Sequence, residues 1–462
     1  MMKIPARLVI CSALLIAQPG QAESLLDIYQ RALLSDPLLR EAEATRFATL
    51  QSKPKALGAL LPQVGANARY TDDESNGATD SSFGGATVRQ DFDDATDGWI
   101  WGVQLTQTLF RWDQWVTLKQ ADKQVAQAEA DYLAAGQDLM IRVSESYFNV
   151  LAAQDTLASE QAAKEAIGRQ LEQAQKRFEV GLIAITDVQE AQAGYDQAVA
   201  TEIGAKRALA SAREGVREII GEYTTDLAGP REQIPLVSPD PEDEDAWVET
   251  ALQQNLSLLS SELGAQIAKD DVRRVRTGHY PTIDLVVTHN DTDVSGNTVR
   301  NNEPSLIGRD SEADSIQVQF ALPIFSGGTT SAQVREAVYR HRAAKERFER
   351  SARQTERQTR DSYLGVISEI SRVKALRQAL QSSQTALQAT EAGFEVGTRT
   401  TVDVLDSRRQ LFIAETNYAR SRYDYILNVL RLKQAAGTLT VDDLSEVDGW
   451  LAEDSAVSGS GG

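Results

Sequence analysis

The sequence predicts a mixed α and β membrane protein whose chain contributes four strands to a β-barrel shared between copies. Long helices project from that barrel. Three observations predict this fold. The chain is an internal duplication, four stretches alternate apolar and polar residues over the length that crosses a bilayer, and one long stretch without proline favours helix.

The duplication is clearest in two short segments that share an unusual pattern. "FEVGLIAITDV" at 178–188 and "FEVGTRTTVDV" at 394–404 lie 216 residues apart. Other pairs recur at nearly the same separation: "ESYFNVL" with "DSYLGVI", "VQLTQTLF" with "VQFALPIF", and "GALLPQVGANARY" with "TGHYPTIDLVVTH". A repeat this long indicates duplicated halves rather than a short-period solenoid.

The duplication divides the chain into two structural repeats, residues 23–227 and 246–440. Between them lies a linker rich in proline and acidic residues, 228–245, and residues 441–462 form a predicted tail. Each repeat has the same order of helix, strand, polar loop, strand and helical hairpin. The two hairpins are predicted at about 112–222 and 329–437.

The first residues have the pattern of a secretory signal peptide. Lys3 and Arg7 give a positive end, an apolar run of ten residues follows, and a small residue precedes Glu23. We therefore predict a signal peptide at 1–22 and an exported protein. The only cysteine, Cys11, lies in that run, so the mature chain would have no disulfide and no thiolate metal site.

The charge and motif content argue against two classes of function. A net charge of −20 opposes nucleic-acid binding, which needs a basic surface. The chain has no HExxH, no phosphate loop and no CxxC, and its three histidines are scattered. We expect no enzyme activity, no cofactor and no metal site.

The helical stretches are long and carry a seven-residue repeat. Between Trp112 and Val180 roughly 68 residues without proline would reach about 100 Å as one helix. After the turn of the second repeat, one apolar or aromatic residue recurs at every seventh position: Val404, Leu411, Tyr418, Tyr425 and Leu432. The first repeat keeps this spacing with one polar interruption, Glu202. A sustained heptad predicts a coiled coil, and an ordinary antiparallel bundle is the alternative.

Four alternating stretches are predicted as membrane strands, at about 62–70, 98–110, 281–289 and 314–325. Each is about ten residues long, which spans the apolar band of an outer-membrane barrel when tilted. Four strands cannot close a barrel, so the barrel must be shared between chains. The intervening polar stretches, 71–98 and 290–315, are predicted as long loops outside the membrane.

Four tryptophans lie around the second predicted strand: Trp99, Trp101, Trp112 and Trp115. Tryptophan is enriched where a membrane meets water, so we predict that they form an interfacial aromatic belt in contact with outer-membrane lipid. Core packing is the alternative for any one of them.

The duplicated turns, the strand pairs and "YDYILNVLRLKQAAGTL" at 423–439 resemble the TolC-type outer-membrane efflux proteins, the outer membrane factor family. The resemblance covers nearly the whole mature chain. It implies a homotrimer, with a twelve-stranded barrel in the outer membrane of a Gram-negative bacterium and a helical coiled-coil tunnel in the periplasm. It further implies an exit channel for drugs, toxic small molecules or proteins, serving tripartite efflux or type I secretion with a periplasmic adaptor and an inner-membrane pump.

The resemblance also assigns roles at the two hairpin tips. Gly181 and Gly397 would allow the chain to reverse, and a latch between the hairpins maps onto Asp187 and Arg399. The family often has a tyrosine in this gate where the present chain has Phe394, which lacks a hydroxyl. Apolar packing of Phe394 is expected in its place.

Asp403 and Asp406 are three residues apart, on one face of a helix. In a trimer they would form two stacked rings of carboxylates at the narrowest entrance, which favours cations. The simpler alternative is a pair of solvated acids. For the whole protein, the alternative function is a soluble periplasmic coiled-coil scaffold that binds protein partners.

Overall fold

A computed structural model describes residues 22–224, 226–231, 234–300 and 303–451. The predicted signal peptide falls outside these ranges except for its last residue, and so does the end of the predicted tail, 452–462. The chain forms two compact units. The first comprises the described residues within Met1–Ala42, Leu133–Asn255 and Gln354–Gly462, and the second those within Glu43–Tyr132 and Leu256–Arg353.

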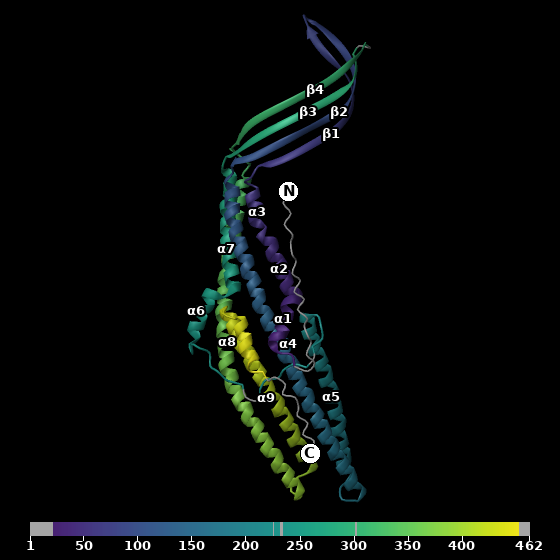
Figure 1. Cartoon of the computed structure of the whole chain (residues 1–462), viewed down its shortest axis with the longest axis vertical. Coiled ribbons are helices and arrows are strands. Elements are labelled where there is room, and N and C mark those ends of the chain that lie inside the picture. Colours follow the sequence, from purple (N-terminus) through teal and green to yellow (C-terminus); the bar gives the residue numbers. More distant parts are fainter. Residues whose placement is uncertain (1–21, 225, 232–233, 301–302, 452–462) are drawn as a thin grey trace, which may run out of the picture. The chain divides into compact units, whose positions relative to one another are not determined.

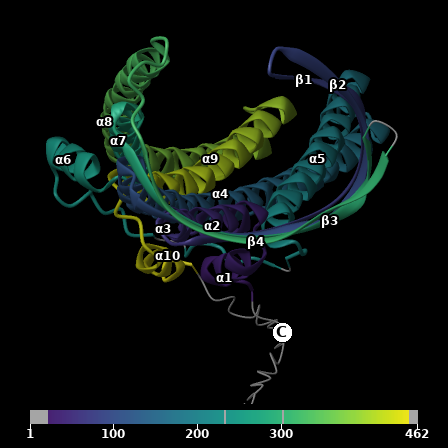
Figure 2. The ribbon, with the colours of Figure 1, turned by 90° about the horizontal axis from the view of Figure 1, so that it is seen from above.

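The second unit contains one antiparallel sheet of four strands in the order β1-β2-β3-β4. Its strands are β1 (Gln63–Phe83), β2 (Ala86–Phe110), β3 (Thr282–Arg300) and β4 (Glu303–Ala321). The sheet curves strongly when viewed from above (Figure 2). Each repeat thus supplies one hairpin, and β2 pairs with β3 where the two repeats meet.

The strands are longer than predicted, and the expected loops at 71–98 and 290–315 were wrong. The β1–β2 ladder continues past the alternating region to Phe83 and Ala86. Backbone hydrogen bonding does not depend on apolar side chains, so polar stretches can extend a ladder in water. Gly84 and Gly85 close this hairpin with φ of +63° and +86°, the positive values that a two-residue turn requires.

The fourth strand ends earlier than predicted, at Ala321 rather than near Phe325. Pro323 follows within two residues, and proline has no N–H to donate to a ladder. The predicted tail at 441–462 is also partly wrong, because α10 (Val441–Asp448) is a helix with Leu444 and Val447 buried. The carboxylate of Asp443 accepts the N–H of Thr440 at 2.7 Å, which starts this helix.

One face of the sheet is apolar across all four strands. Strand register places the members of this apolar face side by side: Val64, Ala66, Ala68 and Tyr70 on β1, Trp99, Trp101, Val103 and Leu105 on β2, Leu285 and Val287 on β3, and Ile316 and Val318 on β4. On the same face, the next residues on β1 and β4 are acidic, Asp72 and Asp314. The apolar face therefore has a sharp boundary.

Helices complete the second unit beside the sheet. They are α3 (Ser52–Gly58), α7 (Leu256–Arg276), the short η1 (Thr277–His279) and the parts of longer helices that fall within it. Lys123 of α4 (Trp112–Glu179) pairs with the buried carboxylate of Asp270 on α7 at 2.6 Å. This ion pair joins helices from the two repeats.

The first unit is built around the ends of two long hairpins. One is α4 with α5 (Ile185–Ile220), and the other is α8 (Thr329–Glu395) with α9 (Thr401–Ala436) (Figure 1). Its largest fully buried side chains include Tyr147, Phe148 and Tyr425. Among the described residues, no helix is long and apolar enough to cross a bilayer.

The heptad residues are largely buried. Val404, Tyr425 and Leu432 are buried, whereas Leu411 and Tyr418 are half-buried. The polar interruption in the first repeat, Glu202, is buried between Lys164 and Lys206, whose ammonium groups lie 2.9 and 2.8 Å from its carboxylate oxygens. Hydrogen bonds from Lys164 and then Lys206 lower the pKa of Glu202 to about 2. This acid therefore stays charged at its heptad position between α4 and α5.

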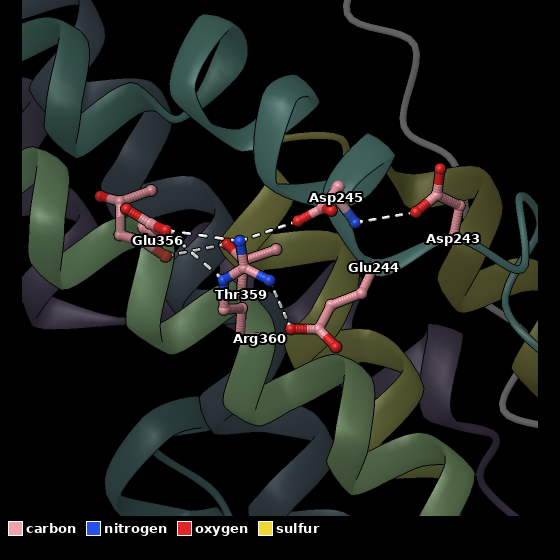
Figure 3. Close-up of polar contacts among 7 residues, drawn as sticks. Asp243, Glu244, Asp245, Glu356, Thr359 and Arg360 are labelled. Atoms are coloured by element: carbon pink, nitrogen blue, oxygen red, sulfur yellow. Dashed lines mark hydrogen bonds and ion pairs between the residues drawn. The ribbon is translucent and has the colours of Figure 1, made fainter.

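The linker contacts the second hairpin through one arginine, Arg360, which lies among acidic residues (Figure 3). Helix α6 (Glu244–Gln254) begins at the linker's end, and Asp243 accepts the N–H of Asp245 at 3.0 Å. Arg360 of α8 donates to Glu244 at 2.7 Å and to Asp245 at 2.8 Å. The bonds to Glu244 and Asp245 raise the pKa of Arg360, which stays positively charged.

A buried carboxylate connects three helices of the first unit. Asp36 lies between α1 (Leu25–Ser35) and α2 (Pro37–Leu50) and accepts the N–H of Leu39 at 2.8 Å. Arg142 of α4 donates two hydrogen bonds to it, at 3.1 and 2.9 Å. Burial alone would raise the pKa of Asp36, but the bonds from Arg142 and Leu39 lower it below its ordinary value.

We expect Asp36→Ala to lower the free energy of unfolding by about 3 kcal/mol, because it leaves Arg142 partly buried without this partner. Asp138→Ala is the matched control, since Asp138 pairs with the same arginine but is exposed. We expect it to cost less than about 0.5 kcal/mol. Denaturant unfolding followed by circular dichroism measures both, and equal losses would contradict the role of the buried pair.

The same pair gives a pH dependence with a definite sign. Because the pKa of Asp36 is lower in the folded protein, its contribution is present above its unfolded pKa and is lost as pH falls through the folded value. The difference between the wild type and Asp36→Ala should therefore shrink on acidification below about pH 4.

Candidate functional site

The first hairpin tip is the short turn between α4 and α5. The N–H of Gly181 donates to the carbonyl of Phe178, and that of Leu182 donates to the carbonyl of Arg177, both at 2.9 Å. These two bonds form a Schellman motif, in which the residue after the helix is left-handed. Gly181 has a φ of +76°, which favours glycine.

The second tip has the same backbone. The N–H of Gly397 donates to Phe394 at 3.1 Å, and that of Thr398 donates to Gly393 at 2.8 Å. Gly397 has a φ of +78°. The two repeats therefore end their long helices in the same way, and the difference between the tips is chemical.

The tips differ in how the following helix starts. At the second tip, the hydroxyl of Thr400 accepts the N–H of Asp403 at 3.3 Å, and the Asp403 carboxylate accepts the N–H of Thr400 at 2.8 Å. At the first tip, Asp187 accepts the N–H of Ala184 at 3.3 Å, but Ala184 has no side-chain oxygen to accept in return. Only the second tip has a complete capping box.

Arg399 packs on its own hairpin. A Cβ at Gly393 would lie 2.8 Å from Cγ of Arg399, so the absence of a side chain at Gly393 allows the stem of Arg399 to lie there. The duplication aligns Gly393 with Arg177 of the first repeat. This exchange of arginine for glycine between the repeats is a sequence signal from which the packing of Arg399 could have been predicted.

Near the tips, a cation–π pair joins the two hairpins. The guanidinium of Arg177 on α4 lies 5.1 Å from the ring centroid of Phe394 on α8. A phenyl ring attracts a cation through its negative face and needs no hydroxyl to do so. Phe394 thus contacts a cation, and Arg177 was not among the predicted gate residues.

The predicted latch residues, Asp187 and Arg399, are not paired with each other in the part of the chain that the structure describes. Among the described residues, the stem of Arg399 lies against Gly393 and its guanidinium forms no ion pair, and Asp187 accepts a backbone hydrogen bond instead. The positive charge of Arg399 acts on Asp403 of its own tip. Hydrogen bonds from the N–H and then the hydroxyl of Thr400, together with Arg399, lower the pKa of Asp403.

The two acids of the predicted ring have different surroundings. Asp403 is half-buried against the start of α9, whereas Asp406 is exposed and lies 3.8 Å from the guanidinium of Arg409. Asp406 also lines a groove of 670 Å³ between the hairpins. This hairpin groove is formed by α4, α5 and α9, with Ile167, Gln197 and Phe412 among its lining residues.

The four tryptophans form two pairs. Trp99 and Trp101 lie on the apolar face of β2, and Trp112 and Trp115 lie at the start of α4. All four are 41–58% exposed in the isolated chain, so none is a core residue within it. Trp112 follows Trp101 by eleven positions, which corresponds to about 25 Å of height at the rise and usual tilt of a barrel strand.

Comparison with protein families finds a match over most of the chain. The model of the family described as "Outer membrane efflux protein" matches residues 28–222 and 247–438. These two segments leave out the linker.

Individual relatives match along nearly their full length. The chain is 38% identical over 430 residues to "Outer membrane protein TolC" of Vibrio cholerae, covering 93% of this chain and 94% of that protein. It is 37% identical to the Escherichia coli protein of the same name, covering 94% and 86%. It is 28% identical to "Alkaline protease secretion protein AprF" of Pseudomonas aeruginosa, covering 94% and 88%.

Solved structures share the fold. The Campylobacter jejuni CmeC outer membrane channel superimposes with a TM-score of 0.74 at 17% identity, covering 93% of this chain and 90% of that one. The open state of the Neisseria gonorrhoeae MtrE outer membrane channel gives 0.68 at 19% identity, covering 91% of each. The strands and long helices of this chain therefore have the arrangement found in outer-membrane channels.

The difference between the tips gives a paired test. Ala184 and Thr400 have nearly the same backbone angles, with φ of −81° and −95° and ψ of 159° and 166°. We expect Thr400→Ala to destabilise the second tip by about 1 kcal/mol and Ala184→Thr to stabilise the first by a similar amount. Amide hydrogen exchange at each tip measures both changes. Exchange rates that do not move in opposite directions would contradict the capping difference.

Proposed function

Because this chain belongs to the outer membrane efflux protein family, we propose that it is the outer-membrane exit channel of a tripartite efflux or type I secretion system. The predicted resemblance to TolC-type proteins is confirmed. So is the outer-membrane location, which excludes the soluble periplasmic scaffold. The relatives are named as membrane and secretion proteins, and we propose that this chain performs no catalysis.

The observation that carries the proposal is the combination of an apolar sheet face with open sheet edges. Within the described part of the chain, β1 and β4 each pair on one side only. In a bilayer each unsatisfied backbone group costs several kcal/mol, so these edges need partners. Three copies would close a barrel of twelve strands with every edge paired, which supports the predicted homotrimer.

The tryptophans support the same placement. Trp99 and Trp101 would lie at one interface of the membrane and Trp112 and Trp115 at the other, because the height between them matches the apolar band of such barrels. The exposed Val64, Ile316 and Val318 would then face lipid. We propose that these residues meet the hydrocarbon of the outer membrane.

The hairpin tips are the proposed gate. Within the described residues Asp187 and Arg399 are not paired with each other, which leaves Arg399 available to the Asp187 of a neighbouring copy. The cation–π pair of Arg177 with Phe394 joins the two hairpins of one copy. Each exposed ion pair is worth only about 0–1 kcal/mol, so a latch of a few such contacts can be opened by a partner protein.

The partners and the cargo follow from the proposed role. An exit channel needs a periplasmic adaptor and an inner-membrane pump to supply it, and we propose that they engage the tips and the hairpin groove. One relative is named for alkaline protease secretion and another as an efflux protein, from Brucella suis. We therefore propose that small toxic molecules or proteins pass through this channel.

Conductance across a planar lipid bilayer tests the channel and its gate together. The purified protein should give stable, cation-selective current steps, and Arg399→Ser should enlarge them several-fold because the latch loses its cation. Arg420→Ser is the matched control, since Arg420 is an exposed arginine further along the same helix, α9. Steps that are unchanged in Arg399→Ser would place the gate elsewhere, and an intact protein without steps would contradict the channel.

The two ring acids can be separated by their surroundings. Asp406→Asn should reduce cation selectivity and block by multivalent cations with no loss of helix stability, because Asp406 is exposed. Asp403→Asn should reduce selectivity and also weaken the start of α9, because its carboxylate accepts from Thr400. Reversal potentials in a salt gradient measure the selectivity. Unchanged potentials in both variants would place the charged constriction at other residues.

A further inference from the structure

A histidine and two carboxylates meet on the same side of the sheet as the apolar face, at the boundary of that face. His289 of β3 lies directly across from Asp314 of β4, and Glu312 follows two residues along on the same side. Nδ1 of His289 lies 2.8 Å from Oδ1 of Asp314 and 4.0 Å from Oε1 of Glu312. One ligand atom from each residue lies within 4.8 Å of the others.

These distances suit a single small divalent ion. Zinc binds imidazole nitrogen and carboxylate oxygen at about 2.0–2.2 Å, so two ligands at a tetrahedral angle are about 3.3 Å apart. The distances from Nδ1 to the two carboxylates lie on either side of that value. The side chains of Glu312 and Asp314 are 70% and 77% exposed, which leaves both carboxylates room to rotate toward one ion.

The surroundings hold the histidine and attract cations. The indole of Trp101 packs against the imidazole with ring centroids 5.3 Å apart, which restricts the rotation of the ring. Asp291 lies across from Glu312 in the β3–β4 register and across from Trp101 in the β2–β3 register. A fourth polar group, the Asp291 carboxylate, thus adds to the negative potential on this side of the sheet.

We propose that His289, Glu312 and Asp314 form a binding site for a divalent transition metal ion of the zinc class, at the boundary of the apolar face. Three protein ligands leave a fourth position for water or an external ligand. The site lies where the apolar surface ends, far in sequence from the residues proposed for the gate. Its existence does not depend on the export activity.

Isothermal titration of the purified, chelator-treated protein with ZnCl₂ tests the proposal. The wild type should bind one Zn²⁺ per chain, and His289→Gln and Asp314→Asn should each weaken binding at least tenfold, because a ligand is lost. Two matched controls remove the same residue types outside the cluster. His279→Gln changes a histidine just after α7, and Asp310→Asn changes an acid further along the same side of β4. Both should bind within twofold of the wild type.

Competition with Mg²⁺ distinguishes a built site from a generally acidic surface. An imidazole ligand favours Zn²⁺, so an equal concentration of Mg²⁺ should leave Zn²⁺ binding unchanged. Equal weakening in the controls and the ligand variants, or displacement of Zn²⁺ by an equal concentration of Mg²⁺, would overturn the proposal. Circular dichroism and size-exclusion chromatography of each variant establish that a loss of binding is not a loss of fold.

Discussion

The pairing of backbone groups in lipid is the constraint on which the rest of this structure depends. A bilayer offers no water to the edges of β1 and β4, so a chain with four strands is incomplete by itself. The apolar face of the sheet is exposed to solvent in the isolated chain. Lipid would cover this face in a membrane, so the face also indicates that the sheet lies in a bilayer. Association of copies is thus a requirement of the backbone, and the symmetry of the channel follows from it.

The start of the first long helix depends on the strand before it. One residue, Arg111, separates the end of β2 from the start of α4, so the position of this strand determines where α4 begins. At the other end, two Schellman turns reverse the helices with the same backbone. The tips differ in their side chains: Arg399, the threonine cap and the arginine of the cation–π pair each occur at one tip.

The sequence predicts the long helices, whose residue pattern is periodic. It does not predict how far the strands extend or which residues distant in sequence come into contact. The helical hairpin predicted at 112–222 corresponds to α4 and α5, because composition and heptads extend over many residues. The polar strand extensions were missed, since alternation weakens where both faces meet water. Arg177 with Phe394, and His289 with Asp314, are distant in sequence, and no local pattern brings them together. The cap at Thr400 could have been predicted from the sequence, because a threonine three residues before Asp403 is the local pattern of a capping box.

The pairing of β2 with β3 has an evolutionary consequence. This internal junction of the two repeats is antiparallel, as the proposed junction between copies would be, so a ring of six single-repeat chains could satisfy the same ladder. In such an ancestral hexamer every tip would be identical, and a mutation at one would appear at all six. Fusion into one gene halves that symmetry. The equivalent positions Ala184 and Thr400 can then differ. The three second tips can acquire the threonine cap and the arginine, while the three first tips keep an apolar surface.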